Sequence, residues 1–144
     1  MGIAVALEGV AELTRKLDAL GKLEDGKALR AAVRAGIKPA EKKAKALIPV
    51  GIDAHKTYKG RLVAPGFARR SIRSITKLDR SKQKASAALG VRQEAFYAVQ
   101  FVEIGTARQA AQPWLRPAFD STLSQQQQAM ADSLRKSIEK AAKK

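Results

Sequence analysis

The 144-residue chain contains no cysteine and a single histidine, His55. Disulfides, thiolate zinc sites, iron–sulfur clusters and cysteine nucleophiles are therefore excluded, as is an all-histidine metal centre. Aromatic residues are also few, at 5% of the chain, and Leu, Ile, Val and Phe together number only 33. This small supply of large apolar side chains predicts a thin core and favours assembly with partners.

Long apolar runs are missing as well, since residues 1–7 form an apolar segment that is too short to cross a membrane. No basic region precedes this segment, as a secretory signal requires, and the sequence carries no lipidation signal. We therefore expect a protein without a membrane partner.

The chain lacks the residue patterns of common catalytic and cofactor sites. His55 stands in a Gly-containing segment, where a solvated side chain is the simpler interpretation, and a nucleic-acid hydrolase would have only this residue and scattered carboxylates to use. Neither a phosphate-binding Gly-Lys-Ser/Thr loop nor a dinucleotide-binding glycine pattern is present. We predict no catalytic residue, no metal site and no cofactor, and hence no enzyme.

Hydrophobic periodicity predicts three elements in the first third of the chain. Residues 3–7 alternate as in a strand with one buried face, and residues 10–20 have the apolar spacing of a short helix. Helical spacing returns over residues 27–48, where Lys and Arg occupy the other faces. Within this longer helix, Pro39 removes a backbone donor and is expected, together with Gly36, to introduce a kink.

The rest of the chain predicts a hairpin and more helix. Residues 72–78 and 84–91 are expected to be two paired strands, whereas residues 97–104 fit either a helix or a strand, with helix favoured. A final helix is expected from about Pro117 onward. Its predicted buried stripe comprises Phe119, Leu123, Met130, Leu134 and Ile138. The pattern predicts one α+β domain over residues 1–144, in which a small, mainly antiparallel sheet (N-terminal strand plus hairpin) is flanked by two or three helices, with a long C-terminal helix.

Basic charge is the strongest compositional signal. The 28 Lys and Arg outnumber the 13 Asp and Glu, which gives a net charge of +15. Residues 53–84 alone hold ten basic and two acidic side chains, and they overlap a non-periodic, Gly- and Pro-containing segment, residues 51–66, that predicts a long basic loop. The predicted basic contact surface comprises Lys56, Lys59, Arg61, Arg69, Arg70 and Arg73.

Such a surface suits an anionic partner, either an acidic protein or DNA. A basic nucleic-acid-binding protein is therefore an alternative function, although only Tyr58 and Phe67 could provide base stacking within the basic region. A further interpretation is that the basic side chains form a solvated surface with no specific partner.

Two segments in the C-terminal half carry a resemblance to a known family. Residues 97–106 read Tyr-Ala-Val-Gln-Phe-Val-Glu-Ile-Gly-Thr, and residues 112–118 read Gln-Pro-Trp-Leu-Arg-Pro-Ala. Together they resemble the most recognisable motif of the tail-completion, or head-to-tail joining, minor tail proteins of tailed bacteriophages. Three earlier segments of the chain also resemble the family pattern, and they occur in the same order as in the family: residues 7–17, 44–50 and 66–72. Residues 52–65 depart from the pattern and look like an insertion.

The resemblance implies a structural α+β subunit that forms a homo-oligomeric ring, with a hexamer expected on a six-fold tail. The ring would lie at the phage neck or the head-proximal end of the tail, completing the tail and joining it to the DNA-filled head. The implied partners are the connector or stopper ring, the tail tube and the packaged DNA. The implied location is the virion, with the host cytoplasm during assembly.

The motif residues either maintain the fold or form an interface, and both interpretations are open. They are Tyr97, Phe101, Glu103, Gly105, Thr106, Pro113, Trp114, Arg116 and Pro117. Gly105 permits a positive φ and Thr106 can hydrogen-bond the backbone of a turn, while Trp114 is predicted to be buried in its own chain or in a neighbour's pocket. Glu103 would need a cationic partner if buried, and the candidates are Arg69, Arg70 and Arg116.

Overall fold

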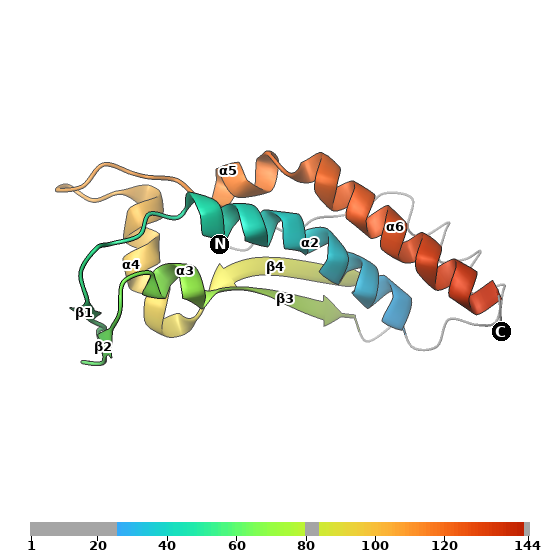
Figure 1. The fold of residues 1–144 in the computed structure, drawn as a ribbon, viewed down its shortest axis with the longest axis horizontal. Coiled ribbons are helices and arrows are strands. Elements are labelled where there is room, and N and C mark those ends of the chain that lie inside the picture. The colour runs from blue at the N-terminus through green and yellow to red at the C-terminus, as the bar shows by residue number, and fades with distance from the viewer. Residues whose placement is uncertain (1–25, 80–83, 143–144) are drawn as a thin grey trace. The chain divides into compact units, whose positions relative to one another are not determined.

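A computed structural model describes residues 26–79 and 84–142 of the chain (Figure 1). The strand predicted over residues 3–7 and the helix predicted over residues 10–20 lie outside the described residues. The part that is described contains five helices and two small antiparallel sheets, ending in a long helix, which confirms the predicted α+β class.

Contacts between residues divide the chain into two compact units. Of the described residues, the first unit comprises 26–38, 74–79, 84–88 and 124–142, and the second comprises 39–73 and 89–123. The expectation of one domain over residues 1–144 stays a prediction.

Helix α2, Lys27–Leu47, forms where the helical spacing predicts it. It begins after Gly26, whose carbonyl accepts the N–H of Arg30, and it ends just before Pro49, which restricts the residue preceding it to extended conformations. The side chains that α2 buries are Leu29, Ala32, Val33, Ile37, Ala40 and Ala44, all at helical spacing. At the C-terminal end, Leu47 is exposed and the following Ile48 is buried.

The C-terminal helical segment is divided into two helices, where the sequence predicts one. Helix α5 spans Leu115–Asp120 and helix α6 spans Leu123–Ala142. At the break between them, the Thr122 hydroxyl donates to the carbonyl of Ala118 at 2.7 Å. The backbone N–H of Thr122 donates to the carbonyl of Phe119 at 3.2 Å, three residues back, so this turn is tighter than an α-helical turn.

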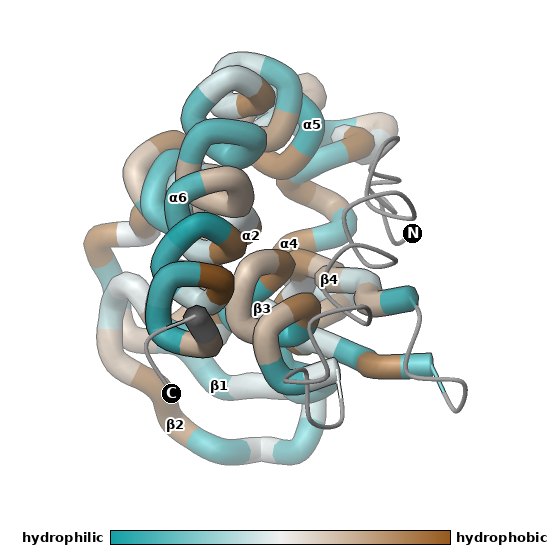
Figure 2. The backbone as a smooth tube through the Cα atoms, turned by 90° about the vertical axis from the view of Figure 1, so that its right-hand side faces the viewer, coloured by the Kyte–Doolittle hydropathy of each residue, from teal (hydrophilic) through white to brown (hydrophobic). Residues whose placement is uncertain are grey.

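This break changes which side chains of the last helix are buried. Met130 and Leu134 are buried as predicted, but Leu123 is exposed and Gln126 is buried. In Figure 2, hydrophobic and hydrophilic bands alternate along α6, as its amphipathic pattern requires. Within the first unit, α6 approaches α2 at Gly36, where an added Cβ would lie only 2.3 Å from Cγ of Met130. Gly36 thus provides space for Met130.

The predicted hairpin is confirmed by strands β3, Ile72–Leu78, and β4, Ala85–Val91. Its closing hydrogen bond runs from the N–H of Asp79 to the carbonyl of Lys84 at 2.8 Å. Two further helices flank it in sequence: the short α3, Phe67–Ser71, and α4, Gln93–Ile104, which resolves the ambiguous segment in favour of helix.

The prediction of a long irregular loop over residues 51–66 is wrong in part. Strands β1, His55–Lys56, and β2, Leu62–Val63, pair in antiparallel register with His55 opposite Val63. The turn between them is closed by hydrogen bonds from Thr57 N–H to the carbonyl of Arg61 and from Gly60 N–H to the carbonyl of Thr57, each 2.8 Å. Strands of two residues are too short to show a period in the sequence, so the pattern could not reveal them. We call residues 55–63 the β1–β2 ribbon.

Candidate functional site

The segment that carries the family motif begins where α4 ends, at Gly105. The N–H of Gly105 donates to the carbonyl of Phe101 at 2.9 Å, and its backbone has φ 77° and ψ 175°. Only glycine adopts this conformation readily. A Cβ at Gly105 would also lie 2.7 Å from the backbone nitrogen of Ala111 and 3.0 Å from the carbonyl oxygen of Gln109. Glycine is therefore required at this position both for backbone conformation and for space.

After Gly105 the chain turns and returns to the end of α4. Thr106 and Gln109 form an antiparallel bridge, in which the N–H of Thr106 donates to the carbonyl of Gln109 at 2.8 Å. The Thr106 hydroxyl accepts the N–H of Arg108 at 3.3 Å, which agrees with its predicted role in a turn. The N–H of Gln112 then donates to the carbonyl of Val102 at 2.8 Å. These bonds bring the second half of the motif beside the first.

Glu103 connects the two halves through its carboxylate. Its Oε2 accepts the N–H of Trp114 at 2.7 Å and that of Leu115 at 3.0 Å, and Oε1 lies 3.5 Å from the N–H of Arg116. These are the free backbone donors at the start of α5, so the carboxylate satisfies groups that the helix itself cannot. An arginine partner is expected only for a buried Glu103, whereas Glu103 is half-buried and its carboxylate is bound by backbone N–H groups.

Trp114 follows directly and is buried, with 2% of its surface exposed. It therefore serves as a core side chain within its own chain. Its indole Nε1–H has no hydrogen-bond partner in the described part of the chain. The other motif side chains are exposed on the surface, namely Tyr97, Phe101, Thr106, Pro113, Arg116 and Pro117.

The role of Glu103 predicts a clear effect of substitution. In Glu103→Gln, an amide NH2 replaces one oxygen of a charged acceptor and faces backbone donors. Because a hydrogen bond to a charged group contributes about 1.5–3 kcal/mol, we expect the free energy of unfolding to fall by about 2 kcal/mol in urea titrations followed by circular dichroism. The matched control is Glu139→Gln on the exposed surface of α6, expected to change stability by less than about 0.5 kcal/mol. Equal effects of the two substitutions would argue against the capping role.

Two members of the predicted basic contact surface have polar partners within the chain, although both are themselves exposed. The Arg70 guanidinium donates to the carbonyls of Pro65 at 2.8 Å and Ala64 at 3.2 Å, and so holds its own loop. Arg61 pairs with Glu94, with Nη1 3.7 Å from Oε2. The remaining members are exposed, namely Lys56, Lys59, Arg69 and Arg73. Their role as a contact surface stays a prediction.

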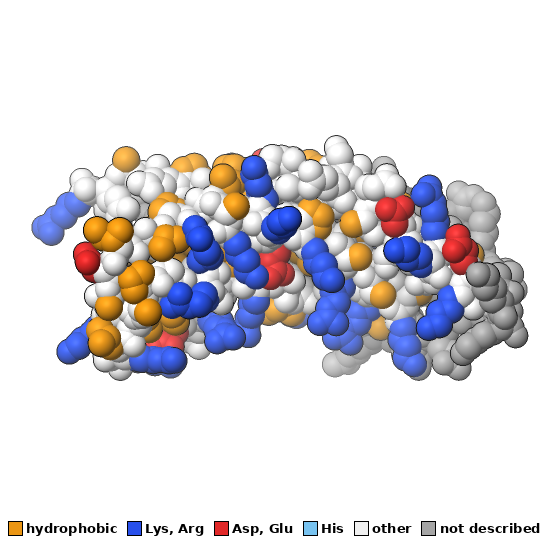
Figure 3. Space-filling view, viewed as in Figure 1, with side chains coloured by type: hydrophobic (Ala, Val, Ile, Leu, Met, Phe, Trp, Pro, Cys, Tyr) orange, Lys and Arg blue, Asp and Glu red, His pale blue; other side chains and the backbone are white. Residues whose placement is uncertain are grey.

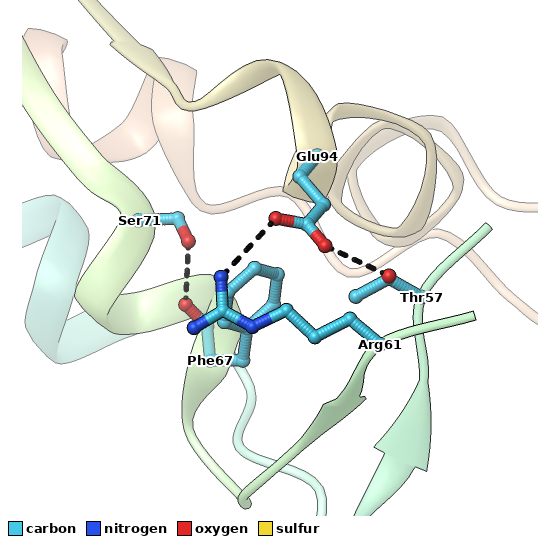
Figure 4. A network of polar contacts seen from close by, with 5 residues as sticks. All are labelled: Thr57, Arg61, Phe67, Ser71 and Glu94. Atoms are coloured by element: carbon cyan, nitrogen blue, oxygen red, sulfur yellow. Dashed lines mark hydrogen bonds and ion pairs between the residues drawn. The ribbon is translucent and has the colours of Figure 1, made fainter. Parts of the chain in front are cut away.

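Glu94 is a residue that sequence reasoning missed. It lies in the first turn of α4, where its carboxylate accepts the Thr57 hydroxyl at 2.8 Å as well as pairing with Arg61 (Figure 4). Figure 4 also shows the Ser71 hydroxyl donating to the Phe67 carbonyl at 2.8 Å in α3, beside this pair. An acidic residue at a helix start was a visible signal, but its partners from the ribbon were not. Glu94 thereby ties the β1–β2 ribbon to α4.

Exposed apolar side chains on α4 and the ribbon were also missed as a group. They include Tyr58, Phe96 and Ile104, in addition to the predicted Tyr97 and Phe101. Figure 3 shows hydrophobic side chains gathered at its left-hand end, where Figure 1 places α4 and the ribbon, with Lys and Arg side chains among them.

Comparison with known proteins decides the family. Residues 11–105 match the family model described as "Bacteriophage HK97-gp10, putative tail-component". The chain belongs to this HK97-gp10-like family. No curated protein and no solved structure matches the chain.

Membership of the HK97-gp10-like family confirms the resemblance drawn from the motif and makes the chain a structural phage tail component, located in the virion. The matched range contains α2 through α4, the ribbon and Gly105. Trp114 and the start of α5 lie beyond it, so the contacts of Glu103 connect the matched range to the segment that follows.

No group of three or more metal-ligating side chains is found in residues 26–79 and 84–142. Within the same ranges, no helix is long and apolar enough to cross a membrane.

Proposed function

We propose that this HK97-gp10-like protein forms a ring at the phage neck or the head-proximal end of the tail, which completes the tail and joins it to the DNA-filled head. The observation that carries the proposal is the family match over residues 11–105. A hexamer is the expected ring, since the tail it would complete has six-fold symmetry. The expected partners are the connector or stopper ring, the tail tube and the packaged DNA, and assembly would take place in the host cytoplasm.

The surface composition supports an assembling subunit. Eleven large hydrophobic side chains are exposed in the described residues. Five of them lie on α4 and the β1–β2 ribbon, namely Tyr58, Phe96, Tyr97, Phe101 and Ile104, and such a group of apolar side chains on a small protein is typical of an interface that becomes buried on assembly. The composition predicts a thin core and therefore assembly with partners, and these exposed apolar side chains could supply the contacts between the partners.

The experiment that tests the function removes the protein from the phage that encodes it. Negative-stain images should then show finished heads and finished tails that fail to join, and purified chain added to the extract should restore infectious particles. Complete virions in the absence of the protein would contradict the proposal.

The exposed part of the basic contact surface provides a second prediction. We expect Lys56→Gln with Lys59→Gln to leave the fold intact, because both side chains are exposed, and to weaken joining in a salt-sensitive way. The matched control is Lys42→Gln with Lys43→Gln, which removes the same charge from an exposed face of α2. The measurement is the yield of infectious, DNA-filled particles across a range of ionic strength. Identical yields for the two double variants would indicate that Lys56 and Lys59 are solvated side chains with no specific role in joining.

A basic nucleic-acid-binding protein is the second candidate, favoured by the net charge of +15. Figure 3 shows Lys and Arg side chains spread over the face that it draws, with few acidic ones. If this function is the correct one, the isolated chain should bind duplex DNA with an affinity that falls steeply with salt, at a slope matching several phosphate contacts.

A further inference from the structure

Helix α4 presents an unusually apolar exposed face. The exposed fractions are 43% for Phe96, 56% for Tyr97, 48% for Phe101 and 58% for Ile104. Tyr97, Phe101 and Ile104 follow at intervals of four and three residues, so they form one stripe along the helix. The opposite side buries Ala95 and Val99. A helix normally packs its apolar stripe against another element, and this second stripe of α4 is left exposed in the isolated chain.

The β1–β2 ribbon extends this stripe. The ring of Tyr58 meets that of Tyr97 edge to face, with centroids 5.7 Å apart, and Phe96 meets Tyr97 in the same way at 5.8 Å. Lys59 Nζ lies 5.6 Å from the Tyr58 ring centroid. We call Tyr58, Phe96, Tyr97, Phe101 and Ile104 the aromatic surface.

Polar contacts fix the ribbon in the position where it adds to this surface. Glu94, three residues before Tyr97, accepts the Thr57 hydroxyl and pairs with Arg61, so residues on both sides of Tyr58 are tied to the start of α4 (Figure 4). Preorganisation of this kind reduces the entropy lost when a partner binds. The insertion over residues 52–65 thus contributes a positioned tyrosine and exposed cations beside the family motif.

We propose that the aromatic surface and the flanking cations of the ribbon bind an acidic, apolar-bearing surface of a different virion protein. The charge of the second unit favours such an occupant: it holds twelve Lys and Arg against five Asp and Glu, and Lys56, Lys59 and Arg61 flank Tyr58. A second copy of the chain would bring the same excess of positive charge to this surface, which opposes its use as the contact between copies in the ring. An acidic surface would offset the charge while its apolar side chains cover the rings.

Duplex DNA fits this surface less well than an acidic protein. Its bases are stacked inside the helix, and its exterior is dominated by phosphates, which the basic side chains could contact but which provide no apolar cover for Phe101 or Ile104. The proposal rests on the proposed function in one respect, because the partner is taken to be a neighbour in the neck or tail.

The experiment places a photo-crosslinking residue on the aromatic surface of the full chain inside assembled particles. Tyr97→p-benzoyl-L-phenylalanine is expected to crosslink to a different virion protein, at a segment that mass spectrometry identifies as rich in Asp or Glu. The matched control carries the same residue at the exposed position of Lys43 on α2 and should not crosslink to that segment. A crosslink from position 97 to a second copy, to DNA or to nothing would overturn the proposal.

A second measurement uses substitution without crosslinking. Tyr97→Ala with Phe101→Ala, added to an extract that lacks the protein, should need at least about 30-fold more chain to restore half of the infectious particles, as expected when hot-spot aromatics are lost. Leu123→Ala, at an exposed position outside the aromatic surface, is the control and should behave as wild type. Restoration by the double variant at the wild-type concentration would contradict the proposal.

The outcomes separate this proposal from the proposed function. If wild-type chain restores joining while position 97 crosslinks to DNA, to a second copy or to nothing, the function stands and the proposed partner is wrong. If position 97 crosslinks to an acidic segment of another protein while heads and tails join without the chain, the partner stands and the joining function is wrong.

Discussion

Trp114→Ala is expected to lower the free energy of unfolding by about 3–5 kcal/mol, the usual cost of removing a buried aromatic side chain. Trp114 is 2% exposed and lies at the start of α5, where its backbone N–H donates to the Glu103 carboxylate, and the same helix buries Ala118 and Phe119. Its removal would leave a cavity in the second unit that neighbouring helices cannot fill without moving. Urea unfolding followed by circular dichroism measures the change, since the only tryptophan is lost in this variant.

The conservative variant Trp114→Phe is the control for this prediction. It removes an indole N–H that has no partner in the described residues, and it keeps most of the ring volume, so the loss should be clearly smaller than for alanine. Wild-type tryptophan emission should be blue-shifted and protected from iodide. A red-shifted and readily quenched emission would contradict the burial on which the prediction depends.

Gly105→Ala is expected to lower the free energy of unfolding by at least about 3 kcal/mol. Placing a non-glycine residue at φ 77° and ψ 175° costs about 1–3 kcal/mol by itself. The new Cβ would also lie 2.7 Å from the backbone nitrogen of Ala111, an atom that moves only if the returning loop opens. Because this loop brings the start of α5 to Glu103, opening it would also separate the cap from its donors.

Two other glycines separate these contributions. Gly60→Ala also has a positive φ, of 78°, but no atom lies within 4 Å of the added Cβ, so it should show a conformational cost without a steric one. Gly51→Ala has neither constraint and should leave stability unchanged within about 0.5 kcal/mol. If Gly105→Ala were no worse than Gly60→Ala, the close approach of Ala111 would have no energetic consequence.

The sequence by itself determined the elements whose apolar residues repeat over several turns or strand positions. Helix α2, the β3–β4 hairpin and the helical character of α6 follow from local periodicity, because side-chain spacing and backbone period must agree wherever one face is buried, whereas the periodicity of residues 97–104 left helix and strand open. Gly105 is a further success of the same kind, since its positive φ is a local property of the chain. The motif similarly identified the phage tail family that the comparison confirmed.

Only the tertiary structure decided the partners of the charged side chains. Glu103 binds backbone N–H groups 11 to 13 residues further along, and Arg61 and Thr57 reach Glu94 from a segment more than thirty residues away. Periodicity says nothing about such pairs, because they depend on how the loops between them turn. The same reason applies to the aromatic surface: α4 carries apolar side chains on two opposite faces, and only the inward packing of Ala95 and Val99 determined that Tyr97, Phe101 and Ile104 face outward.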